Sequence, residues 1–240
     1  MTDDARPRAG WGWREALAVV VTAHVALILV GGLILQAGGW VVKVGNDYLP
    51  VPATGQILAT TPFWIVAIAG SWWVSGRDGA DARTALGVSL RPVDVPLGIA
   101  AGVIAQWVLI PIVYWPLLRL VGSDTTELEK AARGLVDASG GVGGTVALVA
   151  MTCVLAPIAE ETMYRGLVQR GLAPFGGVVA VGATSLLFAA MHFQMLQLVG
   201  LAIFGAVSGV LVWRTGRLGP GIVAHMAFNA STVIPLLLRR

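Results

Sequence analysis

Ionisable side chains inside the apolar stretches of the chain are the first candidates for chemistry. All eight Asp lie in the termini or in polar segments, and of the five Glu only Glu160 and Glu161, within VLAPIAEETMYRGL, have an apolar context. The three histidines, His24, His192 and His225, also lie in apolar stretches. An ionisable group inside a membrane span costs about 2.5–3.5 kcal/mol on insertion scales, so such groups are functional candidates by default.

The two adjacent glutamates cannot share one role if their segment is helical, because neighbouring helical residues point about 100° apart. Glu161 precedes Arg165 by four residues, which is the favourable order for an ion pair on a helix. That pair leaves Glu160 alone and facing elsewhere, available as a general base. The structural alternative is that both glutamates are partnered and only hold helices together.

The histidines near the C-terminus have polar or aromatic neighbours at helical spacing. His192 follows Phe188 by four residues, and Asn229 follows His225 by four, so each pair projects from one helix face. Imidazole and carboxamide groups can stabilise a developing oxyanion. A single buried histidine is more often an interhelical hydrogen-bonding group, but acids, imidazoles and an amide on three segments favour a joint site. His24 has no comparable partner nearby, and we interpret it as structural.

Three motifs on successive apolar segments resemble the signature of the CPBP family: Glu160-Glu161-x-x-x-Arg165, Phe188-x-x-x-His192 and His225-x-x-x-Asn229. This family contains the type II CAAX prenyl proteases and the bacteriocin-processing intramembrane endopeptidases, and it is also called the Abi family. The resemblance covers roughly residues 143–238, and every signature position is present.

The resemblance implies hydrolysis of a peptide bond within the membrane by a water that a glutamate activates. Glu160 would be the general base, and His192 would position and polarise the water. His225 and Asn229 would receive the tetrahedral oxyanion. The implied partners are a membrane-bound peptide or protein substrate, prenylated at a CAAX sequence or bacteriocin-like, and the lipid bilayer.

The resemblance also implies that the Glu161–Arg165 pair fixes the orientation of the helix and of an imidazole. We expect no cofactor. Two glutamates and two histidines are nevertheless metal-ligand types, and the family has long been labelled as metalloproteases. A divalent metal such as zinc, held by Glu160, His192 and His225, is therefore the alternative.

Other chemistries have less support from the residues. No HExxH motif is present, and no pair of Asp lies in apolar sequence, as an aspartyl intramembrane protease needs. Ser208, between Gly205 and Gly209, is better interpreted as a small-residue helix contact than as a nucleophile. The non-enzymatic alternative is a transporter, scaffold or immunity protein, in which Glu160 and His192 form a proton relay.

The elements that must position these residues are membrane-spanning helices. The 240 residues are 56% hydrophobic and 12% charged, with a mean hydropathy of +0.79, whereas soluble domains carry about 25% charged residues. A span needs about 20 mostly apolar residues, and such runs lie at about 15–37, 56–75, 95–121, 143–159, 175–193, 195–213 and 219–238. We predict an all-α, polytopic transmembrane helical bundle of seven to eight spans in the cell membrane, with no nucleic-acid partner.

The polar segments complete this organisation. We expect a loop or interfacial segment at 40–52, and a solvated loop with some helix at 122–141. The third run is expected to be kinked or split at Pro111 and Pro116. If 175–193 crosses completely, His192 lies at the far face, and it meets Glu160 only if the fourth helix continues to about residue 172.

The basic residues predict the orientation of the chain in the membrane. Ten of them, including Arg165, fall on the N-terminal side of the bundle and six on the other, which places the N-terminus inside. We therefore divide the chain into a cytoplasmic N-terminal segment (1–14), N-terminal transmembrane helices and loops (15–141) and a catalytic core (142–240).

Overall fold

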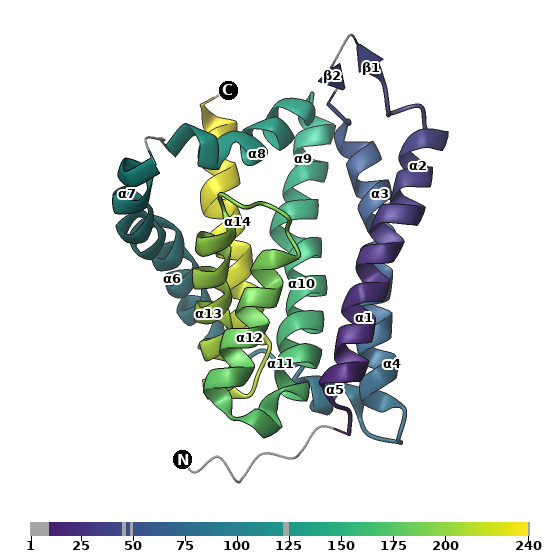
Figure 1. Cartoon of the computed structure of the whole chain (residues 1–240), viewed down its shortest axis with the longest axis vertical. Coiled ribbons are helices and arrows are strands. Elements are labelled where there is room, and N and C mark those ends of the chain that lie inside the picture. Colours follow the sequence, from purple (N-terminus) through teal and green to yellow (C-terminus); the bar gives the residue numbers. More distant parts are fainter. Residues whose placement is uncertain (1–9, 45–46, 49, 122–124, 240) are drawn as a thin grey trace.

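Helices form nearly the whole of the chain that the computed structural model describes, which is residues 10–44, 47–48, 50–121 and 125–239. Within these residues, six helices are long and apolar enough to cross a membrane, and a seventh apolar helix, α12 (Gly177–Ala190), is shorter (Figure 1). The six are Trp13–Ala37, Ala53–Gly76, Asp94–Leu120, Val142–Gly171, Leu198–Thr215 and Gly219–Leu238. Each predicted apolar run corresponds to one of these helices, so the prediction of a multi-pass helical membrane protein is confirmed.

The first two spans form a hairpin at one side of the bundle. Each is an α-helix interrupted by a π-helical turn: α1 (Trp13–Ala26), Leu27–Gly31 and α2 (Gly32–Ala37), then α3 (Ala53–Ile65), Val66–Gly70 and α4 (Ser71–Gly76). The two helices meet at Gly31, where a Cβ would lie 2.4 Å from the Ala59 carbonyl oxygen. Between them, in the predicted interfacial segment, β1 (Lys43–Val44) pairs antiparallel with β2 (Asp47–Tyr48).

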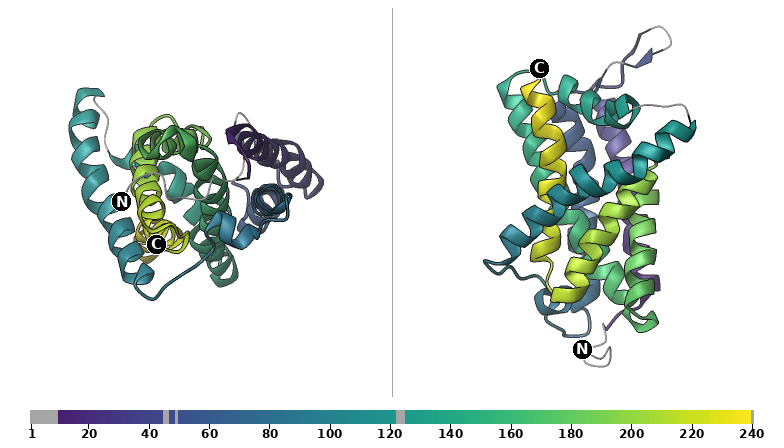
Figure 2. Two further views of the ribbon diagram at one scale, coloured as in Figure 1. Left: turned by 90° about the horizontal axis from the view of Figure 1, so that it is seen from below. Right: turned by 90° about the vertical axis from the view of Figure 1, so that its left-hand side faces the viewer.

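The third span is long and tilted. After α5 (Ala82–Leu86) the chain forms α6 (Asp94–Ile104), a π-helical turn and α7 (Ile110–Val121) without a break, and this rod slants across the C-terminal helix (Figure 2, right). The predicted split at Pro111 and Pro116 is wrong. Proline is tolerated in membrane helices because local π-type adjustments satisfy the backbone groups that it frees.

The predicted solvated loop at 122–141 is mostly a helix, α8 (Thr125–Ala138), which lies across one end of the bundle (Figure 1). From there the chain enters the predicted catalytic core. Its first span comprises α9 (Val142–Ala150), α10 (Ala156–Glu161) and α11 (Gln169–Gly171), joined by π-helical stretches. A 3₁₀ turn, Ala173–Phe175, leads to α12, and α13 (Leu198–Thr215) and α14 (Gly219–Leu238) follow.

The fourth helix continues past Glu160 to Gly171, as a contact between Glu160 and His192 requires. The fifth apolar run, in contrast, forms a helix that is too short to cross the membrane. α12 has 14 residues, a length of roughly 20 Å, against a hydrocarbon thickness of about 30 Å. The expectation that 175–193 spans the membrane is therefore wrong, because the helix ends at Ala190. His192 consequently lies partway through the bundle and not at its far face.

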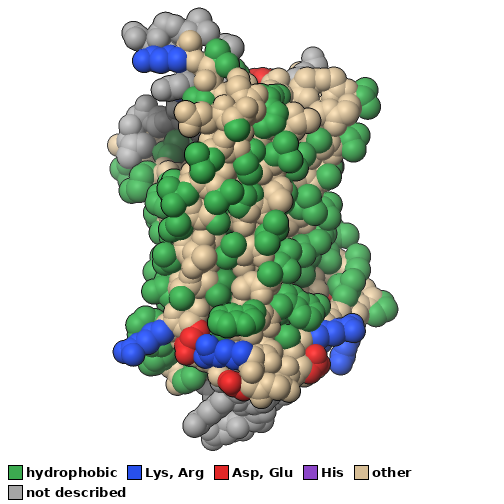
Figure 3. All heavy atoms as spheres, turned by 90° about the vertical axis from the view of Figure 1, so that its right-hand side faces the viewer, with side chains coloured by type: hydrophobic (Ala, Val, Ile, Leu, Met, Phe, Trp, Pro, Cys, Tyr) green, Lys and Arg blue, Asp and Glu red, His purple; other side chains and the backbone are tan. Residues whose placement is uncertain are grey.

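Charged side chains are concentrated at the ends of the bundle. Figure 3 shows one face on which hydrophobic side chains cover the middle, while Lys, Arg, Asp and Glu gather near the lower end. At that end Arg217 donates through Nε to Asp94 at 2.9 Å, and the carboxylate raises the pKa of the Arg217 guanidinium. Arg165, which we assigned to a segment at this end, is instead a buried helix residue that does not contribute to the charged end.

Candidate active site

Three elements of the core carry the predicted site residues to similar depths. Glu160 lies on α10, His192 follows the end of α12, and His225 and Asn229 lie on α14. Counted along each helix from the end that holds the N-terminus, Glu160, His192 and Asn229 lie roughly 15–20 Å into the bundle and His225 about one turn less. The chain therefore brings together all the residues of the three motifs.

Glu161 occupies the closed side of this region and has no exposed surface. Its carboxylate forms an ion pair with Arg165 Nε at 3.3 Å, as the spacing predicts, and accepts hydrogen bonds from His225 Nδ1 at 3.0 Å and Ser208 Oγ at 2.5 Å. A buried carboxylate needs such a set of partners, because leaving any charge unpaired in a low dielectric is costly.

The same helix face binds α13 through two backbone carbonyls. Arg165 Nη2 donates to Gly205 O at 3.2 Å, and one turn further Gln169 Nε2 donates to Gly209 O at 3.0 Å. The Arg165 guanidinium also lies over the Phe188 ring, 4.6 Å from its centroid. Together these contacts fix the rotation of the α10 helix about its axis.

Ser208 does more than the helix contact that its small-residue neighbours predict. It lies at a close approach of α13 and α14, where a Cβ on Gly221 would lie 3.0 Å from Ser208 Oγ and 3.2 Å from Glu161 Oε2. Its hydroxyl is also a hydrogen-bond donor to Glu161. The hydroxyl proton is thus directed at a carboxylate.

The end of α12 fixes the tautomer of His192. Met191 N bonds Leu187 O, but His192 N bonds Ala189 O at 3.3 Å, so the Phe188 carbonyl is left without its helical partner. His192 Nδ1 lies 2.7 Å from that carbonyl. Since a carbonyl oxygen can only accept, Nδ1 carries the proton and Nε2 is directed away from the helix end.

Glu160 faces both imidazoles across a gap. Its Oε2 lies 3.9 Å from His192 Nε2 and 3.9 Å from His225 Nε2, and its side chain is 16% exposed. These distances exceed a direct hydrogen bond of about 2.7–3.2 Å. Glu160 therefore makes no direct hydrogen bond to either imidazole, and each 3.9 Å separation is one that a single water can bridge.

Asn229 is held by a backbone irregularity in the fourth span. In the π-helical turn, the amide of Ala156 bonds to Met151 O instead of Thr152 O, and the next possible partner, Pro157, has no N–H. The Thr152 carbonyl therefore accepts a hydrogen bond from Asn229 Nδ2 at 2.7 Å. One amide proton of Asn229 and its carbonyl oxygen stay available.

Aromatic rings fix both imidazoles from the side away from Glu160. The Phe188 ring centroid lies 4.6 Å from that of His192 and 5.7 Å from that of His225, and the Phe204 centroid lies 4.8 Å from His225. Edge and tilted contacts of this kind restrict ring rotation.

A cavity of about 730 Å³ opens beside Glu160. It extends along α7 and α14 to Arg119 and Arg239, toward the end of the bundle that holds the C-terminus, and His192, His225, Asn229 and Glu160 all line it. Its other lining is mainly apolar, with a few neutral polar groups that include Gln106 and Gln194. The sequence patterns did not single out Gln106, although it is a carboxamide within an apolar run, as Asn229 is.

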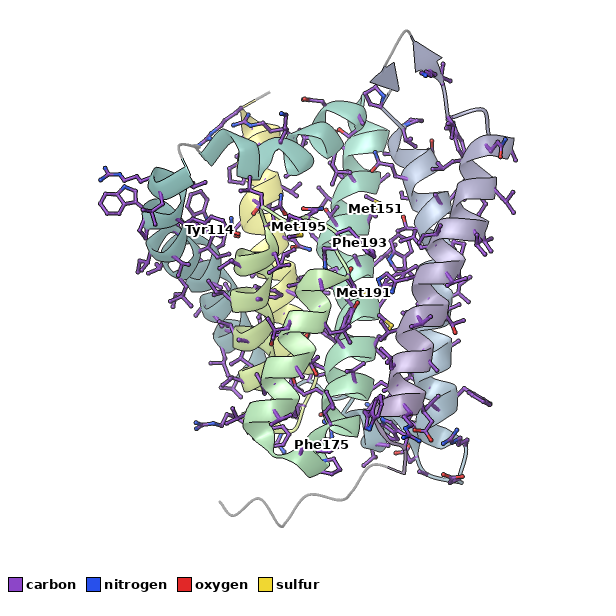
Figure 4. All side chains as sticks on the ribbon, viewed as in Figure 1. Tyr114, Met151, Phe175, Met191, Phe193 and Met195 are labelled. Atoms are coloured by element: carbon purple, nitrogen blue, oxygen red, sulfur yellow. The ribbon has the colours of Figure 1, made fainter. Side chains whose placement is uncertain are left out.

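The segment 191–197 between α12 and α13 borders this cavity. Phe193 has a positive φ of 54°, an unusual conformation for a residue with a side chain. Tyr114 of α7 anchors the segment: its hydroxyl donates to Leu196 O at 2.6 Å and accepts from Gly200 N at 3.1 Å. Figure 4 shows Tyr114 beside the part of the segment that carries Met195. Irregular backbone at membrane depth is tolerated where it lines a cavity, as this segment does.

Two polar residues of the apolar runs lie outside this constellation. His24 is buried, its Nδ1 lies 2.8 Å from Val20 O, and its ring packs edge-on against Phe63. Cys153 is a buried free thiol. Both contacts of His24 agree with its structural interpretation.

The geometry does not match a tetrahedral zinc site. Zinc ligands about 2.0–2.1 Å from the metal lie about 3.3 Å from one another, and Glu160 Oε2 is 3.9 Å from each histidine nitrogen. Among the described residues, no group of three His, Cys, Asp or Glu side chains is arranged to hold a metal ion.

The fold and the site define a class: a helical membrane protein with glutamate, histidine and asparagine side chains around an interior cavity. Residues 142–231 match the family described as type II CAAX prenyl endopeptidase Rce1-like. This match supports the resemblance of the three motifs to the CAAX protease family. That family implies a protease. No curated protein and no solved structure matches the chain.

Proposed function

We propose that the protein is an intramembrane endopeptidase that hydrolyses a peptide bond of a membrane-associated substrate, with Glu160 as the general base. The observation that carries this proposal is the position of Glu160 Oε2, 3.9 Å from two imidazole Nε2 atoms at the wall of a cavity. We propose that a water bridges Glu160 Oε2 and His192 Nε2, about 2.8 Å from each atom.

The reaction follows from these positions. Glu160 accepts a proton from the bridging water as the water oxygen attacks the peptide carbonyl carbon. The unprotonated Nε2 of His192 accepts the other proton of the water in a hydrogen bond and orients its lone pair. Collapse of the tetrahedral intermediate breaks the C–N bond, and the proton on Glu160 passes to the leaving nitrogen.

Asn229 and His225 supply donors for the oxyanion. Asn229 has an amide proton left after its bond to Thr152 O. For His225 to donate through Nε2, both ring nitrogens must be protonated, with Nδ1 donating to Glu161 at 3.0 Å. Fixed donors in a site of low dielectric stabilise such an anion strongly.

The substrate we propose is a peptide segment that enters the cavity from the bilayer, either prenylated at a CAAX sequence or bacteriocin-like. The cavity of about 730 Å³ has the size of a typical ligand site, about 300–1,000 Å³. Its largely apolar wall accepts hydrophobic side chains or a lipid chain.

The test is cleavage of quenched fluorescent peptides, with and without a prenyl group, by purified protein in lipid nanodiscs. Glu160→Gln is expected to abolish turnover. Glu15→Gln is the matched control, because Glu15 pairs with Arg77 outside the cavity. Cleavage that survives Glu160→Gln contradicts the proposal, and proton flux without cleavage supports a relay instead.

Metal dependence is tested in the same assay. We expect turnover to resist chelators, with no stoichiometric metal in the active protein. Loss of activity on chelation and its return with zinc would show that Glu160, His192 and His225 move closer together to bind a metal.

A further inference from the structure

We infer that Gln106 and Gln194 bind the backbone of an extended peptide in the cavity. This inference rests on the proposed function, and it names what the site recognises: the neutral amide groups of an unwound chain segment. Both glutamines line the cavity together with Glu160.

Gln106 is a polar residue in an otherwise apolar stretch. It lies in the π-helical turn Ala105–Leu109 between α6 and α7, within the sequence AGVIAQWVLI. Its side chain makes no hydrogen bond or ion pair to any residue that the structure describes, and it borders the cavity. A carboxamide without a partner at membrane depth is costly, so we expect a ligand to supply the partner.

Gln194 supplies an independent observation from a different segment of the chain. It lies two residues after His192 in the segment 191–197, and its Oε1 is buried without a hydrogen-bond partner. This oxygen can only accept, so it requires an N–H or O–H donor. The segment that carries it is held by Tyr114, which keeps its position relative to His192 constant.

The chemistry of these groups favours a peptide backbone. A peptide bond is reached by water only where the substrate is not helical, and each unwound residue exposes one N–H and one C=O that water cannot satisfy in the bilayer. Carboxamides offer both a donor and an acceptor and carry no charge. Gln194 Oε1 thus accepts from a substrate N–H, and Gln106 pairs with a second amide of the substrate.

The experiment measures the binding of fluorescein-labelled hydrophobic peptides to Glu160→Gln protein in nanodiscs, so that cleavage does not interfere. The peptides form a series in which one backbone amide at a time is replaced by an ester, which removes a single N–H. We expect one ester position to raise Kd about three- to tenfold, the effect of one hydrogen bond.

Adding Gln194→Met is expected to raise Kd for the all-amide peptide by a similar factor and to abolish the further effect of that ester. Gln106→Met is expected to weaken binding of the all-amide peptide by a similar factor while leaving the ester effect intact. Gln36→Met, at an exposed position of α2 away from the cavity, is the matched control and is expected to leave both measurements unchanged.

The outcomes separate the two proposals. Ester effects that stay the same after Gln194→Met, or unchanged affinity in both variants, overturn the inference even if the wild-type protein cleaves peptides. Binding with the expected ester effect but without cleavage by the wild-type protein overturns only the hydrolysis. A chain that binds none of the peptides contradicts both.

Discussion

The two adjacent glutamates lie in environments that differ in almost every respect. Glu161 is fully buried and has three partners on three elements, Arg165, Ser208 and His225. Glu160 borders a cavity, and its nearest ionisable partners lie 3.9 Å away. The helix separates the two carboxylates by about 100°, which is enough to place one in a closed network and the other beside open space.

This difference indicates how to interpret buried polar groups in a membrane bundle. In the closed region around Glu161, the carboxylate has three partners, and Gly205 O and Gly209 O accept hydrogen bonds from the same helix. Arg165 Nε and Nη1 and Gln169 Oε1 are nevertheless buried without a hydrogen-bond partner. On the cavity side, hydrogen-bond partners among the described residues are lacking for the Glu160 carboxylate, for both Nε2 atoms and for Gln194 Oε1. What separates the two regions is access: groups that line the cavity can act on a substrate, whereas groups enclosed between helices hold the helices together.

The largest expected effect is on turnover, when residues that border the cavity are changed. Glu160→Ala and His192→Ala are each expected to lower kcat by at least about 10²–10⁴-fold, the contribution of general acid–base catalysis. The thermal unfolding midpoint of Glu160→Ala in detergent should stay close to that of the wild type, since this side chain is not bound into the closed network. His192→Ala also removes the bond to Phe188 O, so we expect a small fall in its midpoint with folding retained. If Glu160→Ala lowered the unfolding midpoint as much as Glu161→Ala does, the two glutamates would not differ in their contribution to stability.

The reverse pattern is expected for Glu161→Ala. The change leaves Arg165, which has no exposed surface, without its counter-ion, and removing one partner of a buried pair costs about 3–5 kcal/mol. We expect lower yield and a clearly lower unfolding midpoint as well as lost turnover. Glu15→Ala, which removes a partly exposed partner of Arg77, is the control, and normal yield of the Glu161 variant would contradict the role of the pair.

The sequence predicts the closed network around Glu161 better than the region that borders the cavity. Helical spacing alone indicates the Glu161–Arg165 pair, because contacts four residues apart are local. Helical spacing also places His225 and Asn229 on one face. The apolar runs predict which helices exist, since the length needed to cross a membrane is fixed by the bilayer.

The features that the sequence did not reveal depend on irregular helix backbone or on tertiary contacts. The end of α12 at Ala190 is stabilised by the bond of His192 Nδ1 to Phe188 O, and hydropathy does not reveal this bond. The partner of Asn229 depends on the π-helical turn before Pro157, which frees Thr152 O. Tyr114 and Ser208 act on residues more than 45 positions away, and no local pattern marks such pairs.

An intermediate effect, on stability, is expected where Gly221 of α14 lies against Ser208 and Glu161. In Gly221→Ala the new methyl would lie 2.7 Å from Val212 Cγ2 and 3.2 Å from Glu161 Oε2. Overpacking of this kind costs about 1–3 kcal/mol, so we expect a lower unfolding midpoint in detergent. Gly182→Ala in α12 has open space around the added Cβ and should not lower the midpoint. Equal midpoints for the two variants would show that the α13–α14 contact is looser than the structure has it.

The smallest expected effect tests whether catalysis depends on a fixed position of His192 beside the cavity. Tyr114→Phe removes the hydroxyl that bonds Leu196 O and Gly200 N, each bond contributing about 0.5–1.5 kcal/mol. Because the anchored segment carries His192, we expect kcat to fall about three- to tenfold while KM changes less. Thr22→Val, which deletes an exposed hydroxyl of α1, should change neither constant. If the unfolding midpoint falls and kcat stays unchanged, the Tyr114 contact is purely structural. If kcat falls and the midpoint stays unchanged, His192 reaches the water only because α7 holds its segment in place.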